Sequence, residues 1–357
     1  MKINDKHIAQ AVELLKLLVS TPSMSREESE AADKLQLFIE NTAPVAIDIH
    51  RHLNNIWCIA PGFDASRPTL LLDAHIDTVK PVAGWSTHPF TPIVKDDAIY
   101  GLGTNDDGAS LVTLLQLFYL ICQKPQQYNT IFLASAEEEV SGKSGIEAVL
   151  PLLPPIACAI VGEPTGMQPA IAEKGLMVLD CAAHGVSGHA ARNIGVNAIY
   201  KAMQDIEWFR SYKFPYSSEL LGDVKMSVTQ INAGTQHNVI PDACNFVVDV
   251  RSNECYSNKE LLEIITNSVE CEVKARSTRL NSSSIPEEHP LVQRAIQLGR
   301  VPFGSPTLSN QALLDFPTLK MGPGESIRSH TAGEFIRIEE IREGLEIFVK
   351  MVDGLKL

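Results

Sequence analysis

A histidine and several carboxylates follow directly after three short apolar stretches of the chain. The stretches cover residues 69–72, 131–134 and 157–161, and the polar residues after them are His75 with Asp77, Glu138 with Glu139, and Glu163. Ligands of open α/β sheets bind beyond the carboxyl ends of strands, so these side chains should share one crevice. Carboxylates crowded in this way take up protons or a cation, because burying uncompensated charge costs several kcal/mol. The pattern therefore predicts a metal site.

Two further residues extend this set. Asp106 lies in a glycine-rich turn before an apolar helical stretch, and His330 follows the turn at residues 322–324. Two histidines and three carboxylates, one of them shared, can give two zinc ions three protein ligands each and leave room for water. Co²⁺ and Mn²⁺ are alternatives to Zn²⁺. Glu138 would bring the cluster to neutrality, and it could deprotonate a water molecule that zinc has acidified.

The elements that must position these residues are predicted from the apolar pattern. The three apolar stretches have strand length and are bounded by turn residues, and residues 109–122 are typical of a buried helix. A helical apolar stripe covers residues 8–19, and Ser25 with Glu28 predicts a capping box before a second helix. Alternation of helices and strands predicts an α/β domain with a central, mostly parallel sheet.

A different pattern begins near residue 176. Strands are expected at residues 177–183, 224–231, 244–250 and 271–275, with helices at residues 197–212 and 259–269. The order β-α-β-β-α-β is that of a ferredoxin-like α+β domain. The chain then returns to the first pattern with a helix near residues 291–298, a strand near 318–321 and a helix at 339–352. We therefore expect residues 1–175 and 283–357 to form one domain and residues 176–282 to be inserted in it.

Composition excludes several classes of protein. The length of 357 residues predicts about two domains, and the net charge of −13 argues against nucleic acid and anionic membranes as partners. The apolar stretch at residues 109–122 is too short to span a bilayer, and no secretory signal is recognised, so a cytoplasmic location is expected. Seven cysteines without a C-x-x-C pair predict neither a disulfide framework nor a cysteine zinc site.

Eight segments carry a resemblance to a known family over nearly the whole chain. They are AHIDTV, WSTHPFTP with YGLGTNDDG, ASAEEEVSG, VGEPT, VSGHAA, HNVIPDACNFVVDVR and MGPGESIRSH. In this order they resemble the dinuclear zinc aminoacylase and carboxypeptidase family, which contains acetylornithine deacetylase and succinyl-diaminopimelate desuccinylase. The resemblance implies a zinc-peptidase-like catalytic domain with an inserted domain that acts as a lid and in dimerisation.

The resemblance also implies roles for the candidate residues. His75 and Glu163 would bind one zinc ion, Glu139 and His330 the other, and Asp106 would bridge them. Glu138 would be the general base, and Asp77 would orient His75 by accepting its other ring proton. A cis peptide bond between Asp106 and Asp107 is expected.

Three residues of the inserted domain are implied in substrate binding. His189 would reach the active site of a neighbouring subunit and stabilise the oxyanion, so we expect a homodimer. Asn238 and Arg251 match positions that bind polar or carboxylate groups of the substrate. Capping and ion pairing within the inserted sheet is the alternative for both. Departures from the family pattern lie at Leu102, Gly108, Asn310 and Gly333.

The predicted function is zinc-dependent hydrolysis of the amide bond of an N-acyl amino acid. N-acetylornithine, or N-succinylornithine, would yield ornithine and a carboxylate in arginine biosynthesis. Alternatives within the family are succinyl-diaminopimelate desuccinylase and a dipeptidase or carboxypeptidase. An alternative of another class is a catalytically silent binding or scaffold protein, although the expected ligands and base are all present.

Overall fold

The computed structural model describes residues 1–124, 126–192 and 194–357, and these form two compact units. The first unit consists of Met1–Ile171, Ile285–Phe303 and Ser309–Leu357, and the inserted unit consists of Ala172–Ser284 and Gly304–Leu308. Within the described ranges, no helix is both long and apolar enough to cross a membrane.

The first unit is built on a large sheet whose centre is parallel. Its order is β1-β2-β6-β3-β7-β17-β8-β15, and β16 pairs with β8. The pairs β6–β3, β3–β7 and β7–β17 are parallel, whereas β1, β2, β8 and β15 pair antiparallel with their neighbours. The strands are β1 (Asp48–His52), β2 (Asn55–Ile59), β3 (Thr69–His75), β6 (Asn129–Ser135), β7 (Cys158–Val161), β8 (Ala170–Glu173), β15 (Ser283–Ser284), β16 (Phe303–Ser305) and β17 (Thr318–Lys320).

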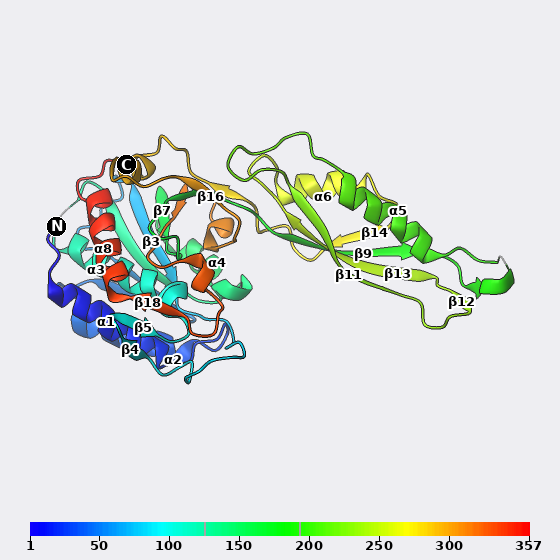
Figure 1. Ribbon diagram of the computed structural model, residues 1–357. Helices are drawn as coiled ribbons and strands as arrows, with labels where there is room; N and C mark the ends of the chain where they lie inside the picture. The colour runs from blue at the N-terminus through cyan, green and yellow to red at the C-terminus, as the bar shows by residue number, and fades with distance from the viewer. Residues whose placement is uncertain (125, 193) are drawn as a thin grey trace. The chain divides into compact units, whose positions relative to one another are not determined.

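All residues of the central strands β3 and β6 are buried, so both faces of these strands are covered, and Figure 1 shows helices beside this sheet. In β3, Leu70 and Leu72 pack with the helices of one face, and Leu71 packs into a separate cluster on the other face with α4 (Ile146–Val149). The helices of the first face are α1 (Asp5–Val19), α2 (Ser29–Thr42), α3 (Ala109–Cys122), α7 (Pro290–Gln297) and α8 (Ile338–Val352). A smaller sheet has the order β18-β5-β4, with β4 (Ile93–Lys95), β5 (Ala98–Tyr100) and β18 (Phe335–Arg337).

The predicted capping box before α2 is wrong. The helix begins at Ser29, and no side chain caps it. The Ser25 hydroxyl donates instead to Asp77 Oδ2 at 2.7 Å. Glu28 is fully buried and accepts hydrogen bonds from the backbone N–H groups of Arg26 and Glu137. The Ser25 and Glu28 side chains therefore hydrogen-bond to groups that the tertiary fold brings near them, and not to the N-terminus of α2 as the sequence suggested.

The inserted unit contains an antiparallel sheet of order β11-β13-β9-β14. Its elements are β9 (Met177–His184), β10 (Gly188–His189), α5 (Ala198–Ser211), β11 (Lys225–Ala233), β12 (Val239–Ile240), β13 (Ala243–Arg251), α6 (Asn258–Thr266) and β14 (Glu272–Ala275). Numbered among the four long strands, the order is 2-3-1-4, which is the ferredoxin-like arrangement. The expected fold, a mostly parallel α/β sheet with an inserted ferredoxin-like unit, is confirmed.

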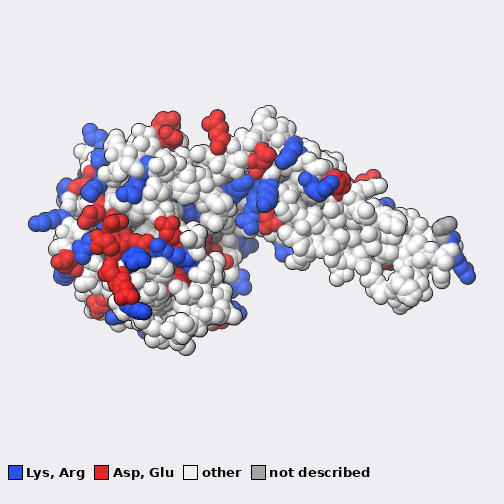
Figure 2. Space-filling view, in the orientation of Figure 1, with Lys and Arg blue, Asp and Glu red and all other residues white. Residues whose placement is uncertain are grey.

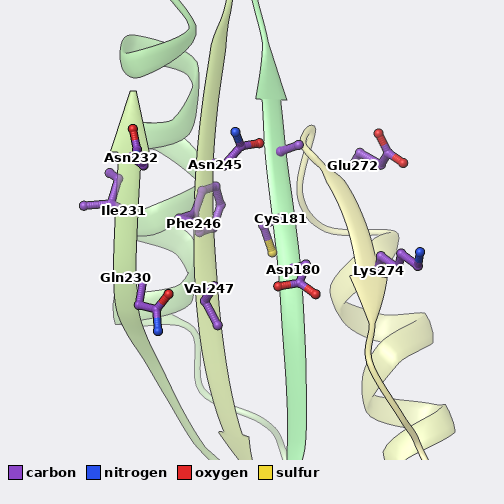
Figure 3. A pocket seen from close by; sticks show the side chains of 11 residues that line it. Asp180, Cys181, Gln230, Ile231, Asn232, Asn245, Phe246, Val247, Glu272 and Lys274 are labelled. Atoms are coloured by element: carbon purple, nitrogen blue, oxygen red, sulfur yellow. The ribbon is translucent and has the colours of Figure 1, made fainter. Parts of the chain in front are cut away.

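One face of the inserted sheet is covered by α5 and α6, and the opposite face is open (Figure 1). Alternate residues of β13 and β9 account for this, because Phe246 and Cys181 are buried, whereas Asn245 and Asp180 are more exposed. A hollow of about 540 Å³ lies on this sheet, and most of its lining residues are labelled in Figure 3.

Candidate metal centre

The predicted ligands come from the ends of parallel strands and from two loops of the first unit. His75 is the last residue of β3, Glu163 follows β7, and Glu139 lies in the short 3-10 helix Glu138–Val140 after β6. Asp106 lies in the turn Thr104–Gly108 before α3, and His330 lies in the loop between β17 and β18. Because β6, β3 and β7 are adjacent and parallel, their carboxyl ends meet at one edge of the sheet.

These five residues form two overlapping triplets. Ligand atoms of His75, Asp106 and Glu163 all lie within 4.8 Å of one another, as do those of Asp106, Glu139 and His330. His75 Nε2 is 3.2 Å from Asp106 Oδ1, whereas His330 Nε2 is 3.6 Å from Asp106 Oδ2. The two carboxylate oxygens of Asp106 therefore face different histidines, which suits a carboxylate shared by two cations.

The donor set fits a divalent transition metal. Each triplet offers imidazole nitrogen and carboxylate oxygen, the ligands of catalytic zinc sites, and three protein donors leave further positions free for water or substrate. Glu138 belongs to neither triplet, and its Oε2 lies 3.9 Å from His75 Nε2. This carboxylate is therefore close to the centre without being one of its ligands.

Asp77 holds both His75 and the backbone of the neighbouring glutamates. His75 Nδ1 lies 2.9 Å from the main-chain oxygen of Asp77 and 3.5 Å from its Oδ1. A proton on Nδ1 leaves Nε2 free to act as a ligand. The Asp77 carboxylate accepts hydrogen bonds from the backbone N–H groups of Glu138 at 3.0 Å and Glu139 at 3.1 Å. Ser25 was expected to cap a helix, but its hydroxyl donates a hydrogen bond to the Asp77 carboxylate.

Burial strongly disfavours negative charge on the carboxylates of this site. It raises the pKa of Glu138 well above its ordinary value, and the nearby Glu139 and Asp77 raise it further, although His75 opposes them. Burial likewise raises the pKa of Glu163 well above the usual range, with the charge of Lys320 acting in the opposite direction. A bound cation would remove this penalty, because it would take the place of the protons.

The pKa values of the two histidines are also raised, which favours their charged forms beside the carboxylates. Burial would lower the pKa of His75, but its hydrogen bonds with Asp106 and Asp77 outweigh this and hold the pKa well above the ordinary value. The hydrogen bond with Glu139 raises the pKa of His330 to about 8. Both imidazoles are thus paired with carboxylates that would be joint ligands of a cation.

Close packing at the strand ends requires small residues. A Cβ on Gly162, directly before Glu163, would lie 2.6 Å from Ser110 Cβ at the start of α3. A Cβ on Gly108 would lie 2.3 Å from the main-chain oxygen of Gly103, so the turn has no room for a side chain at this position.

The other departures and the expected cis bond can also be placed. Asn310 donates from Nδ2 to Asp73 Oδ2 at 3.0 Å, and Gly333 has a φ of +88°, a conformation that favours glycine. The peptide bond between Asp106 and Asp107 is cis, as expected.

Of the three candidates of the inserted unit, His189 and Asn238 lie close together at the small sheet β10–β12, whereas Arg251 lies on the larger sheet. His189 is exposed at the end of β10, and it pairs in register with Val239, the residue after Asn238. Arg251 ends β13 and makes two hydrogen bonds with Asp249, at 2.8 and 3.1 Å. This is the ion pair that the sequence analysis left open as an alternative. All three belong to the inserted unit, whereas the metal centre belongs to the first unit, and their roles stay predictions.

The sheet-edge position, the two triplets and the adjacent free glutamate define the class of metal-dependent amidohydrolases. A sequence model of the peptidase family M20/M25/M40 matches residues 71–354. The chain belongs to this family, and the expected family relationship is confirmed.

Curated relatives match along almost the full chain. An acetylornithine deacetylase of Pectobacterium carotovorum is 26% identical, covering 99% of this chain and 98% of the relative. A succinyl-diaminopimelate desuccinylase of Corynebacterium glutamicum is 25% identical, covering 94% of each chain. A Bacillus subtilis protein described as a dinuclear metal-binding peptidase of the M20 family has the same fold. Its TM-score is 0.74 at 16% identity, over 98% of this chain and 100% of that one.

Proposed function

We propose that this amidohydrolase removes the acyl group of an N-acylated amino acid, N-acetylornithine or N-succinylornithine, to release ornithine and a carboxylate. The observation that carries the proposal is Asp106, shared between two ligand triplets with Glu138 beside them. The acetylornithine deacetylase name of a 26% identical relative supports the choice of substrate. In the cell this reaction would serve arginine biosynthesis.

Zinc is the proposed metal, with cobalt or manganese as substitutes. His75, Asp106 and Glu163 would hold one ion, and Asp106, Glu139 and His330 a second. When bound, two such ions supply Lewis acidity, which lowers the pKa of water and polarises the acyl oxygen.

Glu138 would move the proton in the reaction. Its carboxylate would accept a proton from the attacking water and deliver it to the amine nitrogen as the C–N bond breaks. Asp77 supports this role, because its carboxylate accepts the hydrogen bond from the Glu138 backbone N–H at 3.0 Å. His189 of a second copy would donate a hydrogen bond to the developing oxyanion, while Asn238 and Arg251 would bind polar groups of the substrate.

The inserted unit would pair with a second copy of the chain. Tyr200 and Met203 lie one turn apart on α5 and are 68% and 59% exposed, and Ile231 on the edge strand β11 is 58% exposed. Figure 2 shows a broad uncharged area on the visible face of the inserted unit. The seven free cysteines agree with the expected cytoplasmic location.

A substrate panel tests the proposal. The zinc-loaded protein is assayed with N-acetylornithine, N-succinylornithine, N-acetylcitrulline, N-succinyl-diaminopimelate and dipeptides, and kcat/KM is compared. We expect an acylornithine to exceed the others by about tenfold or more, which corresponds to about 1.4 kcal/mol of discrimination. A preference for N-succinyl-diaminopimelate or dipeptides would overturn the substrate assignment.

Glu138→Gln provides the matched control. The variant keeps the shape of the side chain but cannot accept the proton, so kcat should fall by about 10²–10⁴ while zinc content stays unchanged. Near-normal turnover in this variant would show that another group is the base.

A further inference from the structure

A buried amide joins the turn that carries Asp106 to the loop that carries His330. Asn105 immediately precedes Asp106 and is fully buried. Its Nδ2 donates to the main-chain oxygen of Glu325 at 3.1 Å and to Ser329 Oγ at 3.3 Å, and its Oδ1 accepts from the Glu325 N–H at 3.0 Å. One side chain therefore holds the segment just before His330 through three hydrogen bonds.

A buried carboxylate makes the reverse connection from the other side of His330. Glu334 is 1% exposed, and its Oε1 accepts hydrogen bonds from the backbone N–H groups of Asn105 at 2.8 Å and Asp106 at 3.0 Å. Its own main-chain oxygen accepts from Gly101 N–H at 3.0 Å. Both flanks of His330 are thus tied to the same turn.

His330 has little support of its own. Its side chain is 51% exposed, and its backbone has a φ of +59°. In the described part of the chain, its ring contacts Glu139 and Asp106, which are the other two members of its triplet. The distance between His330 and Asp106 therefore depends on the hydrogen bonds of Asn105 and Glu334, which join the His330 loop to the Asp106 turn.

The other triplet does not use this loop. His75 ends β3 and Glu163 follows β7, and these two strands are paired directly in register. Strand pairing sets that spacing, whereas the Asp106–His330 spacing is set by hydrogen bonds between a turn and a loop. Cation affinity depends on such spacings, because ligands must be held close to the productive geometry.

We propose that Asn105 and Glu334 are positioning residues that set the distance between Asp106 and His330 and thereby determine the affinity of the second cation site more strongly than that of the first, which shares only Asp106 with it. This inference rests on the proposed two-cation centre, but it is independent of which amide is hydrolysed. In this proposal, strand pairing positions His75 and Glu163 of the first site, whereas side-chain hydrogen bonds between a turn and a loop position His330 of the second site.

The test is a zinc titration of the metal-free protein by calorimetry with a competing chelator. Asn105→Ala and Glu334→Ala should weaken the second zinc by about 10–100-fold, as loss of residues that orient metal ligands does, and weaken the first, which shares Asp106, by a clearly smaller factor. Glu334→Gln keeps an oxygen acceptor for both N–H groups and should retain wild-type affinities. Equal weakening of both sites, or no change in either alanine variant, would overturn the proposal.

A milder variant covers the case in which the alanine variants do not fold, as judged by circular dichroism. Ser329→Ala removes one hydroxyl that Asn105 contacts, and it should weaken mainly the second zinc, by a smaller factor. An unchanged second site in Ser329→Ala, together with a weakened second site in Glu334→Gln, would contradict the assigned contacts.

The titration separates this inference from the proposed function. A wild-type protein that binds two zinc ions with the predicted variant pattern but hydrolyses no acylornithine would retain the inference and refute the substrate. If the wild-type protein hydrolyses an acylornithine but the Asn105 and Glu334 variants bind both zinc ions normally, the substrate assignment would stand and this inference would be refuted.

Discussion

Asp106 is the ligand on which both triplets depend, whereas Glu163 belongs to one. We expect Asp106→Asn to lower the affinity for both cations and Glu163→Gln to lower the affinity for one, because an amide is a weaker ligand than a carboxylate. Metal content after dialysis, measured by mass spectrometry, checks this. Asp96→Asn, at an exposed residue of the turn between β4 and β5, is the control and should keep the wild-type content. Equal losses in Asp106→Asn and Glu163→Gln would contradict a bridging role.

The protonation of His330 predicts how cation binding depends on pH. Its hydrogen bond with Glu139 raises its pKa from 6.5 to about 8. A raised histidine pKa stabilises the metal-free fold below pH 6.5, and this contribution is lost as the pH rises through about 8. A cation must displace the same proton, so affinity at the second site should fall as the pH decreases below about 8.

Calorimetry in buffers of different ionisation enthalpy measures the released protons. We expect proton release on zinc binding at neutral pH, and a smaller release in His330→Ala. Affinity that stays constant between pH 6.5 and 8 would show that the His330–Glu139 pair does not limit binding.

Among the helices, α3 links the core to the metal centre, because it begins directly after the turn that carries Asp106. Leu115 is fully buried in this helix, whereas Leu37 of α2 is 58% exposed. Leu115→Ala should reduce the free energy of unfolding by about 2–5 kcal/mol through lost contacts and a cavity. Leu37→Ala should change it by less than about 0.5 kcal/mol. Thermal and urea unfolding followed by circular dichroism compare the two, and similar losses would argue against the described burial.

For the assembled molecule, the proposed dimer makes each active site depend on two chains. Glu138→Gln and His189→Ala should each be inactive alone, because one lacks the base and the other the oxyanion donor. In a mixed dimer, the intact Glu138 of one chain would meet the intact His189 of the other. Random reassociation should therefore restore about a quarter of wild-type activity. A mixture no more active than its components would refute the exchange of His189 between subunits.

The apolar surface of α5 allows the dimer to be tested directly. Met203→Glu places a charge among exposed apolar side chains and should shift the protein towards monomer in light scattering. Val301→Glu, at a 68% exposed residue of the first unit, is the matched control and should leave the mass unchanged. An unaltered dimer in Met203→Glu would exclude this face of α5 as the interface.

Local patterning accounts for the elements that the sequence predicted well. The helix expected at residues 109–122 is α3 (Ala109–Cys122), and the stretch expected at residues 131–134 lies within β6. Both are continuously apolar and buried, so composition alone identifies them. The strand β1 was missed, because its sequence Asp-Ile-His-Arg-His is mostly polar and its side chains are partly exposed. It is a strand because it pairs with β2 at the sheet edge.

The amino-acid sequence was sufficient for the fold class, the family and the five candidate ligands, because apolar periodicity and short motifs are local properties. It could not identify Asn105 and Glu334, which lie 229 residues apart and gain meaning only where folding buries them together. The same holds for Ser25, whose hydroxyl meets Asp77 across 52 residues rather than a nearby helix end. Buried polar groups need partners, and three-dimensional packing selects which ones come within reach.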